Sequence, residues 1–360
     1  MSIGKHLVVV AAGTGGHVMP GIAVAEALRG RGWSVSWLGT RSGMERGLVE
    51  RHGIDFDAID FSGLRGKGLR TLLFGGFLLL RAMWQSRARL RARAAKAVFS
   101  TGGYVAVPAG MAASTLGMPL ILMNSDADSL LSTRLLAPLA AGVLCGFDGG
   151  AAARAGGKGV VTGNPVRAEI AAIAVPAERY AGRSGPLTLL VIGGSLGAQV
   201  LNEVVPVALS RIPTERRPRV VHQCGARHVA AVQTAYRAVQ VDAEIIAFID
   251  DIAQRYAAAD VVVCRAGAIT ITELAVAGVA SILVPLVAST TQHQRGNAEY
   301  LANRGAALHL PQRELTAERL AGLLEGLTRE RLLGIANAAR ALGRPNATAM
   351  VAEVIERVAT

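Results

Sequence analysis

A strand, a glycine-rich turn and a helix follow one another at residues 8–28, and this unit constrains the fold more than any other stretch. The apolar run at 8–12 indicates a buried strand, and apolar residues at helical spacing over 18–28 indicate a helix. Glycines at 13, 15 and 16 allow close approach of a ligand, and the first amides of a helix favour negative charge. His17 follows this turn, and histidine is a side chain whose ordinary chemistry suits proton transfer near neutral pH.

A second copy of this unit lies in the other half of the chain, at residues 189–198. For one isolated loop, the alternative of a tight turn with a solvated histidine remains open. The repeat favours a ligand site. A nicotinamide enzyme is the main rival, but its fingerprint expects an acid at the end of the second strand. Here that strand ends in Trp37-Leu38-Gly39-Thr40-Arg41, and Ala12 replaces the first glycine.

Strand-like and helix-like segments alternate almost throughout, which predicts parallel sheets covered by helices. We predict two doubly wound α/β domains at 1–163 and 164–340, joined near 162–165, where glycine and proline interrupt the pattern. Ligands of such sheets bind beyond the carboxyl ends of the strands, so both glycine loops are expected at one cleft. The predicted strands are 7–12, 34–38, 55–59, 97–100, 120–123, 142–145, 187–192, 219–222, 244–247, 261–264, 281–284 and 307–310.

The chain has 360 residues, 51% hydrophobic and 18% charged, which describes a well-buried globular protein. The net charge of +12 is uneven, because residues 1–163 hold 18 basic and 9 acidic side chains, and residues 164–360 hold 20 and 17. Aromatic residues make up only 4%, which argues against a stacking platform for nucleic acid. Three cysteines without ligand-like spacing predict a reducing cytoplasm, and the first apolar run predicts a strand, not a signal peptide.

One segment breaks the alternation. Residues 72–80 are almost entirely apolar, and between Arg65 and Lys96 there are nine basic residues and no acidic one. The apolar part is about ten residues, or ~15 Å as a helix, which is half of the ~30 Å hydrocarbon core of a bilayer. The combination suits a surface that lies on anionic lipid headgroups. The alternatives are a buried helix with a solvated basic face, and nucleic-acid binding, for which no recognisable module is present.

Several polar residues of the second half could bind a sugar nucleotide. Glu273 lies about one turn into a helix after a buried strand, where a carboxylate accepts hydrogen bonds from vicinal hydroxyls; the alternative is a favourable helix-dipole position. His293 and Gln294 offer neutral donors and acceptors for sugar hydroxyls, or form an ordinary helix start. Arg167 at the domain join and Ser195 in the second glycine loop are suited to a pyrophosphate, or to capping and surface roles.

These motifs together resemble the MurG family of bacterial transferases, which move N-acetylglucosamine from its UDP-sugar onto undecaprenyl-pyrophosphoryl-N-acetylmuramyl pentapeptide. The resemblance covers nearly the whole chain. The matching segments, in order, are Gly13-Thr14-Gly15-Gly16-His17, 62–68, Gly102-Gly103-Tyr104, Gly163-Asn164-Pro165-Val166-Arg167, 193–198, Phe248-Ile249-Asp250-Asp251, 264–268 with Glu273, and 293–298.

The resemblance implies two Rossmann-like domains facing across a cleft, the GT-B arrangement, with the final helix at 341–360 returning to the first domain. It implies an inverting hexosyltransferase that makes lipid II from lipid I for peptidoglycan synthesis, and hence for cell shape and division. His17 is our candidate base. The implied substrate-binding residues are Thr14, Gly15, Gly16, Asp126, Arg167, Ser195, Ile249, Ala268, Ile269, Thr270, Ile271, Thr272, Glu273, His293 and Gln294, with Gly102, Gly103 and Tyr104 on the acceptor side.

One stretch departs from the family pattern. Where the family has His-Glu-Gln-Asn after the fifth strand, this chain has Met123-Asn124-Ser125-Asp126, so that Asp126 stands in place of an asparagine near the donor. No motif implies a metal or another cofactor. The implied partners are UDP-N-acetylglucosamine, the lipid-linked acceptor, an anionic membrane surface at the cytoplasmic face of the inner membrane, and other cell-wall proteins, but no nucleic acid. A UDP-N-acetylglucosamine epimerase and a non-catalytic UDP-sugar-binding scaffold remain the alternatives.

Overall fold

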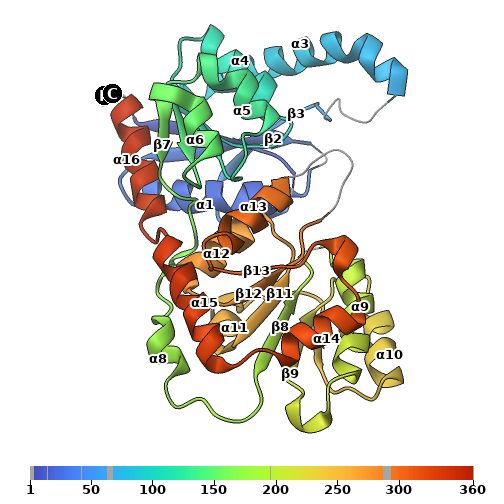
Figure 1. The fold of residues 1–360 in the computed structure, drawn as a ribbon. Helices are drawn as coiled ribbons and strands as arrows, with labels where there is room; N and C mark the ends of the chain where they lie inside the picture. Colours follow the sequence, from blue (N-terminus) through green and yellow to red (C-terminus); the bar gives the residue numbers. More distant parts are fainter. Residues whose placement is uncertain are drawn as a thin grey trace. The chain divides into compact units, whose positions relative to one another are not determined.

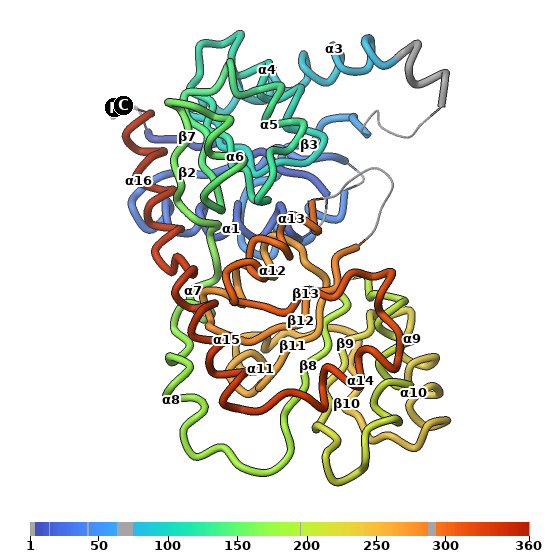
Figure 2. The backbone as a smooth tube through the Cα atoms, in the orientation of Figure 1, coloured from blue at the N-terminus to red at the C-terminus, as the bar shows by residue number. Residues whose placement is uncertain are grey.

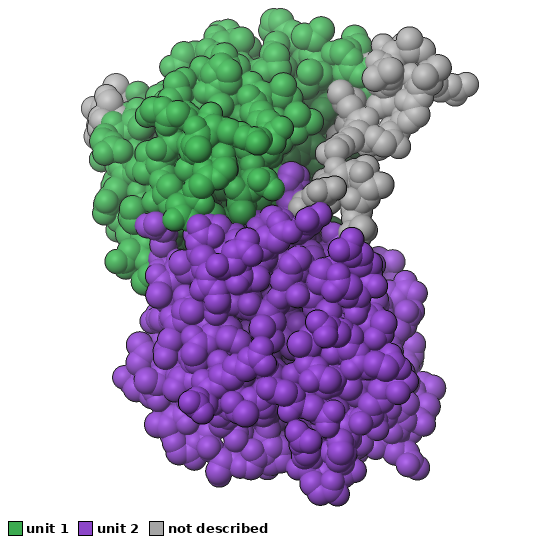
Figure 3. Space-filling model, viewed as in Figure 1, with its two compact units in different colours: residues 1–167, 345–360 green, residues 168–344 purple. Residues whose placement is uncertain are grey.

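The computed structural model describes residues 4–13, 15–41, 43–62, 68–194, 196–286 and 293–359. The chain divides into two compact units, residues 1–167 with 345–360 and residues 168–344, coloured separately in Figure 3. The division falls four residues after the predicted boundary at 163. The last helix belongs to unit 1, as Figure 2 shows by its place beside the blue amino-terminal elements.

Unit 1 holds a seven-stranded parallel sheet in the order β3-β2-β1-β4-β5-β6-β7 (Figure 1). All six strands predicted for this half are present. A seventh strand, β7, which has three residues and lies at the sheet edge, was not predicted. The strands are β1 (His6–Ala11), β2 (Ser34–Thr40), β3 (Asp55–Ile59), β4 (Ala97–Gly102), β5 (Leu120–Asn124), β6 (Gly142–Cys145) and β7 (Gly159–Val161).

Helices cover this sheet, and apolar residues of β1 and β4 alternate between two hydrophobic clusters. The final helix α16 packs against α1 through Val351 and Ile355, which are fully buried with Leu28 in one of the clusters. The helices of unit 1 are α1 (Gly15–Arg29), α2 (Glu45–Arg51), α3 (Gly68–Ala92), α4 (Ala106–Thr115), α5 (Leu131–Leu136), η1 (Ala137–Leu139), α6 (Gly150–Ala155), η2 (Gly156–Lys158) and α16 (Ala347–Ala359).

Unit 2 holds a six-stranded parallel sheet in the order β10-β9-β8-β11-β12-β13, and all six of its strands were predicted. The predicted class of two parallel α/β domains is thereby confirmed. The strands are β8 (Thr188–Ile192), β9 (Arg219–Gln223), β10 (Glu244–Ile246), β11 (Val261–Cys264), β12 (Ser281–Leu283) and β13 (Leu308–His309).

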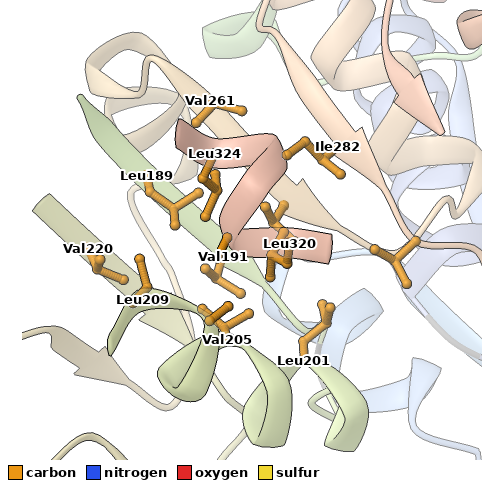
Figure 4. Close-up of a cluster of buried hydrophobic side chains, with 14 of the residues drawn as sticks. Leu189, Val191, Leu201, Val205, Leu209, Val220, Val261, Ile282, Leu320 and Leu324 are labelled. Atoms are coloured by element: carbon orange, nitrogen blue, oxygen red, sulfur yellow. The ribbon is translucent and has the colours of Figure 1, made fainter. Parts of the chain in front are cut away.

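A large hydrophobic cluster of unit 2 lies between one face of this sheet and the helices that cover that face. Figure 4 shows Leu189 and Val191 of β8 facing Leu201 and Val205 of α9 and Leu320 of α14. The helices are α7 (Ala168–Ala171), α8 (Pro176–Tyr180), α9 (Gln199–Ser210), η3 (Thr214–Arg216), α10 (Val229–Ala238), α11 (Ile252–Ala258), α12 (Ala268–Ala277), α13 (His293–Ala302), η4 (Gln312–Glu314), α14 (Ala317–Glu325) and α15 (Arg329–Leu342).

In each sheet the strand order reverses beside the first strand of the unit, between β1 and β4 and between β8 and β11. Crevices at such reversal points, beyond the carboxyl ends of the strands, are where open α/β sheets bind ligands. The two glycine loops follow β1 and β8. Each loop therefore lies at the position in its own unit where a ligand site is expected.

Candidate functional site

His17 is the third residue of α1 and is half-buried beside the end of β4. Its Nδ1 atom lies 2.9 Å from the carbonyl oxygen of Thr101, and the Thr101 hydroxyl donates to the His17 carbonyl oxygen at 2.6 Å. Thr101 is the extra residue of a β-bulge, because Val10 pairs with Ser100 and Ala11 with Gly102. Bulges re-aim backbone groups beside functional sites.

This contact selects one tautomer of His17. A carbonyl oxygen only accepts hydrogen bonds, so Nδ1 carries the proton of the neutral ring and Nε2 keeps its lone pair. The imidazole is thereby held in the form in which Nε2 acts as a base.

Gly102 and Gly103 let the loop after β4 approach the first glycine loop closely. Both have positive φ, +111° and +83°. A Cβ on Gly103 would lie 2.2 Å from the Ala12 carbonyl oxygen, and one on Gly102 would lie 3.0 Å from the His17 ring. Only glycine fits both the backbone conformation and the space. The structure thus brings His17 together with the predicted acceptor-side residues, including the partly exposed Tyr104 that follows them.

Gly15 and Gly16 form the first residues of α1, so their backbone amides belong to the helix start, where partial positive charge gathers. Thr14 lies outside the described residues, and so does Ser195 of the second loop. Arg167, the last residue before unit 2, is half-buried.

The departure at 123–126 covers the end of β5 and the start of the loop that follows it, and the Asn124 side chain holds this loop. Asn124 is completely buried, and its Nδ2 donates to the carbonyl oxygens of Asp126 and Asp128 while its Oδ1 accepts from the Leu130 amide. These bonds use the Asn124 side chain to shape the loop. Asp126 is half-buried at the turn that Asn124 holds.

The second glycine loop is held by Gln223, a residue that our sequence reasoning missed. The Gln223 Oε1 accepts from the Gly194 amide at 3.0 Å, and its Nε2 donates to the carbonyl oxygens of Gly194 at 2.7 Å and Ala247 at 3.1 Å. Ala247 precedes Phe248 and Ile249. One buried amide therefore connects the loop suited to phosphates with the segment that the resemblance associates with uracil. A polar residue ending a buried strand next to a glycine loop is the signal that could have revealed it.

Phe248 and Ile249 differ in exposure. The Phe248 side chain is 60% exposed and Ile249 is buried, so the aromatic ring faces solvent while Ile249 packs inward.

The predicted binding residues of α12 also differ from one another in how deeply they are buried. Ala268, Ile269 and Thr270 are half-buried at the helix start, whereas Ile271 is completely buried. The Ile271 side chain therefore contributes to the packing of the core of unit 2.

Glu273 and Thr272 are both buried at the sixth and fifth positions of α12. The Thr272 hydroxyl donates to the Ala268 carbonyl oxygen at 2.8 Å, a bond that stays within the helix. Asn297 of α13, fully buried, donates to the Ala266 carbonyl oxygen at 3.1 Å, so it fixes the turn that precedes α12. These contacts set the position of the α12 start.

His293 and Gln294 are half-buried at the start of α13. The Gln294 Oε1 accepts from the Leu286 amide at 2.9 Å, so this carbonyl holds the loop that follows β12, and the amide nitrogen is the group that suits a sugar hydroxyl. Within the described residues, no group of three or more His, Cys, Asp or Glu side chains is placed to hold a metal ion.

Helix α3 contains the predicted membrane-facing segment, although the side chains of Leu72, Leu73 and Phe74 lie outside the described residues. Phe77, Leu80 and Trp84 share one face at helical spacing and are 68%, 53% and 66% exposed. The opposite face buries Ala82 and Leu90 against α4. No helix in the part of the chain that the structure describes is long and apolar enough to cross a bilayer.

The basic run of α3 and the following Arg93 is partly neutralised by acidic residues of β3 and by Asp60, which directly follows β3. Sequence reasoning did not anticipate these pairs. Arg93 forms ion pairs with Asp55 and Asp57, and Arg81 pairs with Asp60. The Asp57 and Asp55 hydrogen bonds raise the pKa of Arg93. Arg87 donates to the Thr115 carbonyl and hydroxyl oxygens at the end of α4. Arg89 and Arg91 remain exposed without an ion pair among the described residues.

Comparison with known proteins agrees with this arrangement. Residues 7–145 match the glycosyltransferase family 28 N-terminal domain, and residues 188–358 match the corresponding C-terminal domain. The chain is 57% identical to a UDP-N-acetylglucosamine–N-acetylmuramyl-(pentapeptide) pyrophosphoryl-undecaprenol N-acetylglucosamine transferase of Methylibium petroleiphilum, over 98% of both chains. It is 53% identical to the protein of the same name from Chromobacterium violaceum, over 99% of both.

Solved structures give the same result. The crystal structure of Acinetobacter baumannii MurG superposes with a TM-score of 0.83 and 36% identity, covering 98% of this chain and 99% of that one. A structure titled as a putative UDP-N-acetylglucosamine 2-epimerase from Listeria monocytogenes has a TM-score of 0.66 and 15% identity, covering 98% of this chain and 96% of that one. At this low identity, the second likeness concerns the fold alone.

Proposed function

This chain belongs to the family of UDP-N-acetylglucosamine–N-acetylmuramyl-(pentapeptide) pyrophosphoryl-undecaprenol N-acetylglucosamine transferases, and on that premise we propose how its residues divide the reaction between them. The chain is a UDP-N-acetylglucosamine-dependent glycosyltransferase of peptidoglycan synthesis. It transfers N-acetylglucosamine to the lipid-linked muramyl pentapeptide, lipid I, and produces lipid II.

The reaction is an inverting displacement in which the 4-hydroxyl of the muramyl sugar attacks the donor sugar and UDP leaves. Such a step needs a base at the hydroxyl and stabilisation of the departing diphosphate. The observation that carries the assignment of the base is the Nδ1 contact of His17 with Thr101, which supports Nε2 as the acceptor of the hydroxyl proton. The same contact stabilises the imidazolium once the proton has moved.

Unit 2, together with Arg167, the residue that directly precedes it, binds the donor. Glu273 accepts hydrogen bonds from the ribose hydroxyls, the second glycine loop with Ser195 and Arg167 faces the diphosphate, and the amides at the start of α12 support its charge. Ile249 lies at the uracil, with Ala268, Ile269, Thr270 and Thr272 bordering the site. His293 and Gln294 face the sugar. The reaction needs no metal under this proposal, and unchanged activity after treatment with a chelator is the expected result.

Unit 1 binds the acceptor through Gly102, Gly103 and Tyr104 beside the first glycine loop, with Thr14, Gly15 and Gly16 near the reacting groups and Asp126 near the donor. The protein lies peripherally on the cytoplasmic face of the membrane. The exposed face of α3, with Phe77, Leu80 and Trp84, supports this placement. Leu131, Leu135 and Leu139 of α5 and η1 are also exposed, and α4 contacts both α3 and α5 (Figure 1).

The deciding experiment is product formation with UDP-N-acetylglucosamine and a short-chain lipid I analogue. Disaccharide product together with UDP is expected. An epimerase would convert the UDP-sugar without any acceptor, and a non-catalytic scaffold would bind it without turnover. Turnover of the donor alone, or none with both substrates, would therefore overturn the proposal.

A further inference from the structure

Glu45, the first residue of α2, is a completely buried carboxylate at the end of β2. Its Oε1 accepts from the Thr40 amide at 2.9 Å and from the Thr40 hydroxyl at 2.8 Å, and its Oε2 accepts a longer bond from the Gly13 amide at 3.4 Å. Among the described residues, no Lys, Arg or His forms an ion pair with it. A buried carboxylate without a cation is costly, so its hydrogen bonds must compensate.

The backbone around Glu45 leaves room for this carboxylate. A Cβ on Gly43 would lie 2.0 Å from Oε2, and one on Gly39 would lie 3.1 Å from Oε1. The carboxylate thus occupies space that two glycines leave open, between the end of β2 and the first glycine loop. Its contact with Gly13 supports the glycine loop that precedes His17.

The Thr40 hydroxyl also contacts Tyr104, and the direction of the bonds follows from the proton count. A threonine hydroxyl has one proton, which Thr40 donates to Glu45. The second contact joins Thr40 Oγ1 and the Tyr104 phenol oxygen at 3.1 Å, and in it Thr40 must accept. The single phenol proton of Tyr104 therefore points at Thr40. The ring is also flanked by Phe61, with centroids 6.3 Å apart.

We propose that Glu45, acting through Thr40, fixes Tyr104 as a hydrogen-bond acceptor for a hydroxyl or amide N–H of the muramyl-peptide substrate; this inference rests on the proposed function. Tyr104 is 36% exposed and directly follows Gly102 and Gly103, which lie against His17 and Ala12, so it belongs to the loop that borders the candidate base. Glu45 and Thr40 are positioning residues. They determine the direction of the Tyr104 phenol proton. The phenol oxygen can therefore only accept hydrogen bonds from donor groups of the substrate.

The test is a double-mutant cycle of Thr40→Val with Tyr104→Phe, using a soluble lipid I analogue. Thr40→Val removes the hydroxyl but keeps the branched shape, so the Tyr104 proton is no longer directed. We expect kcat/KM for the acceptor to fall about tenfold, with the KM for UDP-N-acetylglucosamine changed less than about twofold. In the Tyr104→Phe background the same substitution should have no further effect, because its target is absent.

Three further variants separate positioning from structure. Thr40→Ser restores the hydroxyl and should recover most of the activity lost in Thr40→Val. Glu45→Met removes the oxygen that takes the Thr40 proton and should lower kcat/KM for the acceptor as Thr40→Val does. Ser36→Ala, which removes another buried hydroxyl of β2, one that contacts His6, is the matched control and should change neither substrate's KM.

The outcomes are distinguishable. If Thr40→Val is as damaging in the Tyr104→Phe background as in the wild-type background, or affects both substrates equally, Thr40 supports the fold and the inference is wrong while the proposed function stands. If the wild-type protein makes no product from the acceptor, the proposed function fails and the inference fails with it.

Discussion

The Nδ1 atom of His17 is hydrogen-bonded to the carbonyl oxygen of Thr101 at 2.9 Å, a contact between residues that are 84 positions apart in the chain. The β-bulge at Thr101 creates it. The imidazole consequently has one defined tautomer before any substrate binds, which is the arrangement that a general base requires.

His17→Ala is expected to lower kcat by about 10²- to 10⁴-fold, the usual contribution of a positioned base, with little change in the KM for UDP-N-acetylglucosamine. Steady-state kinetics with each substrate varied in turn measures both quantities. His52→Ala is the matched control, because this histidine is paired with Glu26 on the surface of the same unit. An unchanged kcat in His17→Ala would remove His17 from the role of base.

Glu273→Ala is expected to weaken donor binding, because the ribose hydroxyls lose their acceptor at a buried position. A loss of about 1–3 kcal/mol raises the apparent KM for UDP-N-acetylglucosamine by roughly 5- to 150-fold, well beyond any effect on the acceptor. Glu203→Ala, on the exposed surface of α9, should leave both constants as they are. Equal effects of Glu273→Ala on the two substrates would instead indicate a general folding defect.

Gln223→Leu should also raise the KM for the donor, by about tenfold, because the Gly194 amide loses its acceptor and two carbonyl oxygens lose their donor. Gln223→Glu retains an acceptor for Gly194 but cannot donate, so part of the loss should remain. Isothermal titration with UDP measures binding without the reaction. Gln199→Leu, which removes an exposed amide from α9, serves as control. Wild-type affinity in Gln223→Leu would show that the loop holds its shape without this amide.

Membrane binding is expected to have a salt-resistant and a salt-sensitive part. Phe77→Ser with Leu80→Ser should weaken sedimentation with anionic vesicles at high salt, and Arg89→Glu with Arg91→Glu should weaken it at low salt, since each basic residue near anionic lipid contributes about 1 kcal/mol. Arg87 is left intact because it supports the end of α4. Activity on a soluble acceptor should persist in both. Vesicle binding that neither pair alters would place the membrane contact elsewhere.

Because His222 is buried, we expect the free energy of unfolding to decrease in mild acid. Burial between Tyr236 and Asn202 lowers its pKa to about 4, from 6.5 in the unfolded chain. Between those values the unfolded state binds more protons, so the free energy of unfolding falls as the pH falls from 6.5 to 4, and does not change through this residue above 6.5. The total effect is on the order of 3 kcal/mol.

Amide hydrogen exchange of peptides from unit 2 can follow this change. His222→Gln should remove the dependence in that pH window. Tryptophan fluorescence provides the internal control, because Trp33, Trp37 and Trp84 all lie in unit 1. The same acid sensitivity in wild type and His222→Gln would assign it to other groups.

The sequence by itself determined the class of fold and the placement of the glycine loops. Apolar runs that alternate with helical patterns specify buried parallel strands locally, so all twelve predicted strands are present. The missed strand, β7, has three residues and depends on pairing with β6 at Val143 and Leu144. Glycine loops after strands are also a local feature, which is why His17, Gly102 and Gly103 can be named from the sequence.

The tertiary structure alone decided how the polar side chains are used. Three arrangements join residues distant in sequence: the bulge that selects the His17 tautomer, the Gln223 amide that bridges Gly194 and Ala247, and the acids in and directly after β3 that neutralise Arg93 and Arg81. The same holds for the proton direction from Tyr104 through Thr40 to Glu45. Such contacts depend on strand register and on the order of strands in the sheet, which arise from non-local pairing that no local pattern encodes.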